Sequence, residues 1–223
     1  MAKLYIHPLP IRIWHWLNAL GIILLILTGL QIRYAGLFDL MSFRNAVRLH
    51  NWTGFFVAAN FLLWFFYYAF SDRIKVYLPE LNPRKYFPAM FRQVYYYAYG
   101  ILRGEPNPYR VTVYGKFNPM QAMTYQVVML VLLPLQFFTG LLLWDVTGFS
   151  NQIDMLGGIR IVSTVHMLLS IAFVAFLLPH LYLVTLGHTF GAHTKGMITG
   201  YEDVDDEPAN APAAATAPAS SEH

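Results

Sequence analysis

Four histidines lie within long apolar segments of the 223-residue chain and have the residue type that binds iron: His15, His50, His166 and His180. An ionisable side chain in such a segment indicates a functional site, and neutral imidazole is a common metal ligand. Fourteen residues separate His166 from His180. On a helix this spacing is a rise of about 21 Å and a return to within roughly 40° of the same face. One helix therefore presents two imidazoles to one interior at two depths.

The distribution of charge identifies the elements that must position these histidines. Only 12% of the residues are charged, against about 25% in ordinary soluble domains. Four stretches contain no Asp, Glu, Lys or Arg, namely residues 13–32, 49–71, 117–144 and 161–194. A membrane-spanning helix needs about 20 mostly apolar residues. The sequence therefore predicts an all-α integral membrane protein, a four-helix bundle with helices at about 13–33, 50–70, 121–144 and 162–187.

Successive spans alternate in direction, and this alternation predicts the depth of each histidine. His50 and His166 lie near the start of the second and fourth helices, so they share one membrane face. His15 and His180 share the opposite face. Two stacked pairs, His50 with His166 and His15 with His180, are what two haems with bis-histidine ligation require, and bundle interiors are where such cofactors bind.

Composition restricts the kind of cofactor. The chain has no cysteine, which excludes disulfides, iron–sulfur ligands and thioether-attached haem, so both haems are expected to be noncovalent, type b. No carboxylate lies in a predicted span, which disfavours a di-iron site and a proton-coupled transporter. The net charge of +3 with scattered Lys and Arg favours no nucleic-acid partner.

The basic residues predict orientation. The N-terminus, the second connection and the C-terminal region carry eleven Lys and Arg residues, and the other two connections carry four. Positive residues favour the cytoplasmic side. We therefore expect a multi-pass protein of the inner (cytoplasmic) membrane, embedded in lipid, with both termini in the cytoplasm.

Two further segments have distinct compositions. In the second connection, apolar residues recur at helical spacing over residues 89–102, which predicts a short amphipathic helix on the cytoplasmic surface. Residues 202–223 begin acidic and continue rich in Ala, Pro and Ser, which is typical of a disordered tail. The sequence thus predicts one membrane domain, 1–201, followed by this tail.

The histidines belong to a set of motifs that resembles the di-haem cytochrome b family. The motifs are Trp14-His15-Trp16, His50-x-x-x-Gly54, Asn118-Pro-x-Gln121, Thr139-Gly140, His166 with His180-Leu-Tyr182, and Gly200-Tyr201. That family includes the b-type subunits of membrane-bound nickel–iron hydrogenases, formate dehydrogenases and thiosulfate reductases. The resemblance covers about residues 7–201. It implies a respiratory-chain membrane anchor that exchanges electrons between an outer-face oxidoreductase and the quinone pool.

The resemblance also implies roles for individual residues. His50 and His166 would hold an outer haem b, and His15 and His180 an inner one. A quinone pocket for menaquinone or ubiquinone would lie beside the inner haem, with Asn118 as one contact. We add three candidates there: Gln121 for a quinone carbonyl, and Arg12 and His7 for proton supply. Asn118 before Pro119 is equally typical of a helix N-cap, and both roles are compatible.

Two questions about function stay open at this stage. The same fold could be a free-standing cytochrome b that reacts with a small soluble redox molecule such as ascorbate or superoxide. A passive anchor or channel-like protein could also carry structural histidines. For a partner oxidoreductase with iron–sulfur or haem centres, apolar residues in 34–48 and 145–160 favour docking on the outer face. The connection 72–119 and the C-terminal segment offer a competing cytoplasmic site.

Overall fold

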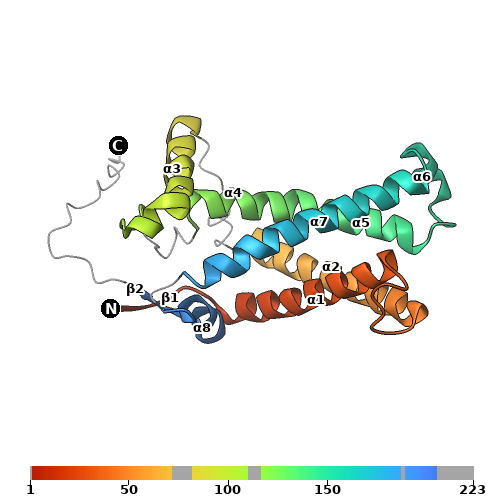
Figure 1. The fold of residues 1–223 in the computed structure, drawn as a ribbon, viewed down its shortest axis with the longest axis horizontal. Helices are drawn as coiled ribbons and strands as arrows, with labels where there is room; N and C mark the ends of the chain where they lie inside the picture. The colour runs from red at the N-terminus through yellow and green to blue at the C-terminus, as the bar shows by residue number, and fades with distance from the viewer. Residues whose placement is uncertain (1, 72–81, 110–116, 187–188, 205–223) are drawn as a thin grey trace, which may run out of the picture.

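A computed structural model describes residues 2–71, 82–109, 117–186 and 189–204 of the chain. Four helices in this part are long and apolar enough to cross a membrane: α1 (Leu9–Arg33), α2 (Phe43–Ala69), the helix Pro119–Trp144 and α7 (Ile159–Val184). They run side by side in an elongated bundle (Figure 1). The predicted fold class, an all-α membrane four-helix bundle, is confirmed.

All four spanning helices begin earlier than the charge-free stretches predicted. α2 begins at Phe43 rather than at residue 50, because the hydroxyl of Ser42 accepts a hydrogen bond from the backbone N–H of Asn45. α1 and the third span begin four and two residues early, each with a proline in its first turn. α7 begins three residues early, directly after two glycines with positive φ, Gly157 and Gly158. His50 consequently lies about two turns inside α2.

Two of the spans contain a proline in their interior and continue past it. The third span consists of α4 (Pro119–Val127), a π-helical turn η4 (Val128–Leu132) and α5 (Leu133–Trp144). Pro134 lacks a backbone N–H, and the wider π turn ends at Leu132, two residues before it. α7 continues through Pro179 and ends at Val184, three residues before the predicted end.

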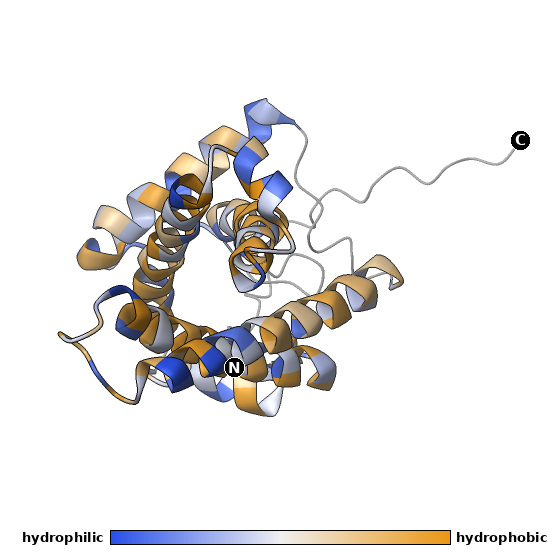
Figure 2. Cartoon of the chain, turned by 90° about the vertical axis from the view of Figure 1, so that its right-hand side faces the viewer, coloured by the Kyte–Doolittle hydropathy of each residue, from blue (hydrophilic) through white to orange (hydrophobic). Residues whose placement is uncertain are grey.

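The helices pack as two pairs, α1 along α2 and α5 along α7. A buried cluster joins all four spans: Ile11, Trp64, Tyr68, Val128, Met129, Leu133 and Phe173. A smaller cluster, Leu142 with Ile153 and Val162, lies near the end of the third span. Many other large apolar side chains are exposed on the outside, and the bundle seen end-on is predominantly hydrophobic in Figure 2. Such a surface suits lipid rather than water.

The two ends of the bundle carry different elements (Figure 1). One end has the α1–α2 connection and the short helix α6 (Ser150–Met155). The other end has α3 (Pro83–Tyr95), α8 (Ala192–Thr199) and a two-stranded antiparallel sheet of β1 (Ala2–Tyr5) and β2 (Tyr201–Val204). The sequence predicted no strand. Glu202–Val204, which the sequence assigned to the tail, are part of β2, and the rest of the predicted tail, 205–223, lies outside the described residues.

The predicted amphipathic helix of residues 89–102 is present but begins six residues earlier. It consists of α3 (Pro83–Tyr95), a π turn η2 (Tyr96–Gly100) and a 3-10 turn η3 (Ile101–Arg103). The side chain of Asn82 caps its start, and Pro83 takes the first helical position. The hydroxyl of Tyr86 donates to the carbonyl of Pro119, which ties α3 to α4.

Candidate haem sites

The first candidate site joins α2 and α7 through His50 and His166. Their ring centres lie 6.3 Å apart, with 70° between the ring planes. Two imidazoles that share one iron have ring centres about 6 Å apart, because each metal–nitrogen bond is about 2.0 Å long. The two rings therefore stand at the separation that a bis-histidine haem iron requires.

A threonine hydroxyl holds the far nitrogen of each of these rings. Thr28 Oγ1 lies 2.9 Å from His50 Nδ1, and Thr139 Oγ1 lies 2.9 Å from His166 Nδ1. Each hydroxyl donates its own proton to a backbone carbonyl one turn earlier, that of Leu24 or Leu135. Each threonine oxygen can then accept a hydrogen bond from imidazole Nδ1–H. This arrangement leaves Nε2 unprotonated, as a metal ligand requires.

Glycines next to these threonines allow the rings to approach the helices. A Cβ at Gly29 would lie 3.4 Å from Cε1 of His50, and a Cβ at Gly140 would lie 3.2 Å from Cε1 of His166. The same dipeptide, Thr-Gly, therefore contacts each histidine. Thr28-Gly29 of α1 contacts His50 of α2, and Thr139-Gly140 of α5 contacts His166 of α7. Sequence reasoning missed the role of Thr28, although the repetition of Thr-Gly at 28–29 and 139–140 was a usable signal.

Gln136 is a further residue at this site that sequence reasoning missed. Its amide Nε2 lies 3.2 Å from Nε2 of His166, on the side where iron would bind. Its Oε1 is buried and has no hydrogen-bond partner among the described residues. Iron coordination by His166 requires the Gln136 side chain to rotate away from this nitrogen.

The second candidate site joins α1 and α7 through His15 and His180. Their ring centres also lie 6.3 Å apart, with 51° between the planes. His180 stacks on Phe176, one turn earlier in α7, and His15 makes an edge contact with Trp16. The structure thus brings together both histidine pairs that the sequence predicted, each at a separation that fits one iron.

Comparison with known proteins identifies the family of the chain. The model of the family described as prokaryotic cytochrome b561 matches residues 6–200. The chain belongs to the prokaryotic cytochrome b561 family. As a member, it is a multi-pass membrane protein that binds haem b and transfers electrons. The predicted relationship to b-type cytochromes is therefore confirmed.

Two relatives of this cytochrome b561 chain illustrate the range of the family. It is 32% identical over 200 residues to the Escherichia coli K12 protein named "Putative cytochrome YdhU", across 89% of this chain and 74% of that protein. It is 26% identical over 196 residues to the Azospira oryzae protein named "Putative protein-methionine-sulfoxide reductase subunit YedZ1", across 81% of this chain and 90% of that protein. No solved structure matches the chain.

Two of the predicted quinone residues of this cytochrome b561 chain form a helix cap. Asn118 is only 4% exposed, and its Oδ1 accepts a hydrogen bond of 2.8 Å from the backbone N–H of Gln121. Gln121 Oε1 accepts one of 3.2 Å from the backbone N–H of Asn118. The remaining amide nitrogen of Asn118 donates to the hydroxyl of Tyr97. The N-cap role that the sequence allowed is therefore present.

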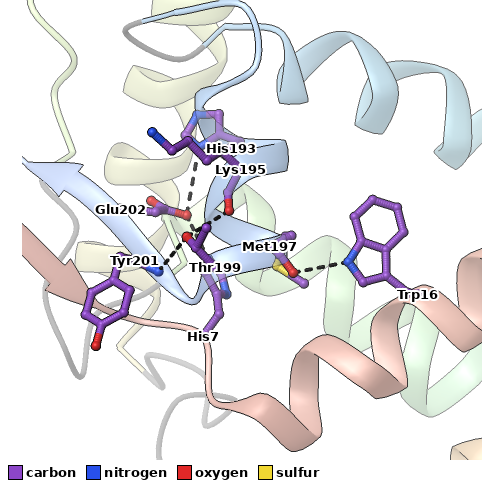
Figure 3. A network of polar contacts seen from close by, with 8 residues as sticks. All are labelled: His7, Trp16, His193, Lys195, Met197, Thr199, Tyr201 and Glu202. Atoms are coloured by element: carbon purple, nitrogen blue, oxygen red, sulfur yellow. Dashed lines mark hydrogen bonds and ion pairs between the residues drawn. The ribbon is translucent and has the colours of Figure 1, made fainter.

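The other two, His7 and Arg12, lie in a separate network that joins residues near the N-terminus to residues 193–202, and Figure 3 shows the part of it around His7. His7 Nε2 lies 2.7 Å from a carboxylate oxygen of Glu202, and His193 Nδ1 lies 3.9 Å from the same oxygen. Arg12 donates to the carbonyl of Ile198, and Trp16 Nε1 donates to that of Met197. We call this network, with strands β1 and β2, the terminal clasp. It ties the first two turns of α1, which carry His15, to α8.

Glu202 makes the terminal clasp sensitive to acid. Although burial raises the pKa of Glu202, hydrogen bonds from His193 and His7 and their positive charge lower it to about 2, from an ordinary value of 4.5. A carboxyl whose pKa is lower in the folded state stabilises that state above its unfolded pKa. This contribution is lost as the pH falls from about 4.5 towards 2.

We expect the terminal clasp to open as the pH falls from about 4.5 towards 2, and Glu202→Gln to remove this transition. The chain has no cysteine, so spin labels on Lys3→Cys and Lys195→Cys report the distance between the two ends of the clasp. The distance should lengthen in acid with Glu202 present. In Glu202→Gln it should already be broader at neutral pH. An identical acid transition in both proteins would show that another group controls the clasp.

Proposed function

We propose that the chain is a di-haem cytochrome b subunit that transfers electrons between a partner oxidoreductase on the outer face and the membrane quinone pool. His50 and His166 would hold the outer haem b, and His15 and His180 the inner one. The observation that carries the proposal is the repeated 6.3 Å separation between the ring centres of two histidine pairs. α7 contributes one histidine to each pair. Each bound haem accepts and releases one electron at its iron.

The surrounding residues suit electron transfer rather than oxygen chemistry. His50 with His166, and His15 with His180, would each hold a haem iron through two imidazoles, which would leave no coordination site for oxygen. Thr28 and Thr139 fix the ring orientation of the outer ligands. Phe176 stacks on the inner ligand His180 at a centroid separation of 5.6 Å. These contacts keep the ligands in place when the iron changes oxidation state.

The experiment that tests this proposal is a haem count on the purified full-length chain. We expect two noncovalent low-spin haems b per chain in the reduced-minus-oxidised spectrum, both of them reduced by a quinol. One haem per chain, or two haems that never equilibrate with quinol, would contradict it. Co-purification of a redox subunit separates a complex from the alternative, a free-standing cytochrome that reacts with a small soluble molecule.

The quinone site would lie beside the inner haem, with Asn118 and Gln121 as contacts and with His7 and Arg12 supplying protons. Asn118 has two separable groups, because its Oδ1 caps α4 and its Nδ2 donates to the hydroxyl of Tyr97. Only the Nδ2 group could also donate to a quinone carbonyl. A variant that keeps the cap and lacks this donor therefore distinguishes the two roles.

We expect Asn118→Ser, which keeps a capping oxygen, to lower quinol turnover by about tenfold, the worth of one hydrogen bond. Asn118→Ala should lower turnover equally and also destabilise α4 by about 1 kcal/mol. Both variants should retain two haems, measured spectroscopically beside steady-state quinol oxidation. Full turnover and inhibitor sensitivity in Asn118→Ser would reduce Asn118 to a helix cap.

The inner-membrane orientation is supported by the end of the bundle at which the basic residues gather. β1, α3 and α8 lie at one end with Lys3, Arg84, Lys85, Arg92, Arg103 and Lys195. In spheroplasts, we expect an impermeant thiol reagent to label Leu37→Cys and Met155→Cys, and to label Lys195→Cys only after lysis. Both outer positions are 87% exposed, so access does not limit labelling. The reverse labelling pattern would show that the protein has the opposite orientation in the membrane.

The outer end also supplies the surface on which a partner would dock. Its exposed apolar side chains are Leu37, Leu40, Phe43, Met155, Leu156 and Ile159. The relative YedZ1 is named as a reductase subunit, which supports a partner for this chain as well. Photocrosslinkers at Leu37 and Met155 should capture a redox subunit in membranes. Capture from Lys195 or α3 alone would move the partner to the cytoplasmic side.

A further inference from the structure

We propose that Thr28 and Thr139 are positioning residues that together lower the redox potential of the outer haem, by each accepting a hydrogen bond from the Nδ1–H of one axial histidine. This inference rests on the proposed function, because it takes His50 and His166 as the ligands of that haem. It goes further by assigning control of the potential to two residues on the neighbouring helices, α1 and α5.

We infer the direction of both hydrogen bonds from the contacts of the two hydroxyls. Thr28 Oγ1 lies 2.6 Å from the carbonyl oxygen of Leu24, and Thr139 Oγ1 lies 2.9 Å from that of Leu135. A hydroxyl has one proton, and these short contacts commit it to the backbone. The distance of 2.9 Å to each Nδ1 is therefore a bond that the imidazole donates.

Burial makes these two bonds effective. Thr28 is 2% exposed and Thr139 is 5% exposed, so water does not compete for either hydroxyl. Gly29 and Gly140 leave room for each ring to reach the threonine beside them, since a Cβ there would touch Cε1 of the histidine. The two halves of the site thus repeat one arrangement, with a histidine on one helix and Thr-Gly on the next.

A hydrogen bond donated by the far nitrogen changes the ligand electronically. It increases the negative character of the ring and makes Nε2 a stronger donor to the metal. A stronger donor stabilises ferric iron more than ferrous iron, which lowers the potential. Two such bonds act in the same direction, so the outer haem becomes a stronger reductant than a bis-imidazole haem without them.

The experiment is a potentiometric titration of the full-length chain with Thr28→Val, Thr139→Val and both together. Valine keeps the shape of threonine and removes the acceptor. Each single variant should shift the ferric–ferrous equilibrium of the outer haem about tenfold towards ferrous, a rise of about 59 mV for a one-electron couple. The double variant should shift it further, and Thr28→Ser and Thr139→Ser should restore the original value.

Two references make the result specific. The inner haem of the same protein should keep its potential in every variant. Thr124→Val is the matched control on the third span, because Thr124 donates to the carbonyl of Met120 in the same way, and it should leave both potentials unchanged. Alanine variants replace valine if valine prevents haem binding.

Unchanged outer potentials in valine or alanine variants with two haems would overturn the inference and leave the proposed function standing. Loss of the outer haem from both the valine and the alanine variants would also overturn it, because the threonines would then be needed for binding rather than for potential. A wild-type chain with fewer than two haems would instead refute the proposed function.

Discussion

Replacing His166 by alanine should halve the haem content, removing the outer haem and leaving the inner one with an unchanged spectrum. The outer iron loses one of two axial ligands, and the other ligand, His50, comes from a different helix. His180→Ala should do the reverse, because His180 lies nearer the other end of α7 and pairs with His15 on α1. The measurement is the haem-to-protein ratio with low-temperature spectra that resolve the two haems.

His193→Ala is the matched control for both variants. His193 is 44% exposed in its side chain and belongs to the terminal clasp, so this variant should keep two haems. Loss of both haems from each ligand variant would contradict two independent haem sites. Retention of both haems in His166→Ala would refute this ligand assignment.

Gly140→Leu should also abolish binding of the outer haem, with all four histidines intact. A Cβ at Gly140 already lies 3.2 Å from Cε1 of His166, so a branched side chain there displaces the ring from the position that iron requires. Gly140→Ala should weaken binding less, since the ring needs to shift by only a few tenths of an ångström. Haem loss on dilution, followed by absorbance, measures the graded effect.

Leu141→Val, at the neighbouring lipid-facing position, is the control for the glycine series and should retain both haems. Leu141 is 39% exposed on the outside of the bundle. Full haem content in Gly140→Leu would mean that the bound ring does not rest against α5 as the structure describes.

The sequence predicted the spanning helices well because lipid leaves few alternatives to a helix. The absence of charge marks the apolar stretches. It does not mark the capped first turns, so the start of α2 at Phe43 was placed seven residues late, at residue 50. The hydroxyl of Ser42 that sets this start is uncharged and therefore carries no signal in a charge count.

The histidine pairs were predictable because a spacing of fourteen residues fixes both depth and face on one helix. The residues around them were harder to predict. Thr28 and Gln136 act across helices, and nothing in the spacing within one helix reveals which neighbour a side chain will meet. The strands β1 and β2 were missed because each is four residues long and their pairing joins the two ends of the sequence.

Asn118 shows why one motif can support two interpretations. The capping geometry with Gln121 follows from local sequence, and the structure contains it. A role in binding quinone depends on the third contact of Asn118, with Tyr97 on η2. That contact depends on how this surface helix packs against α4, which the sequence alone did not predict.

The pairing of β1 with β2 has a consequence for biogenesis. The ribosome makes β1 before the four spanning helices and β2 after them, so the clasp cannot close until all four have been synthesised. His15 likewise enters the membrane with the first span, whereas His180 arrives with the last. The pair His15 and His180 therefore forms only after α7, the fourth of the described spans, has been synthesised.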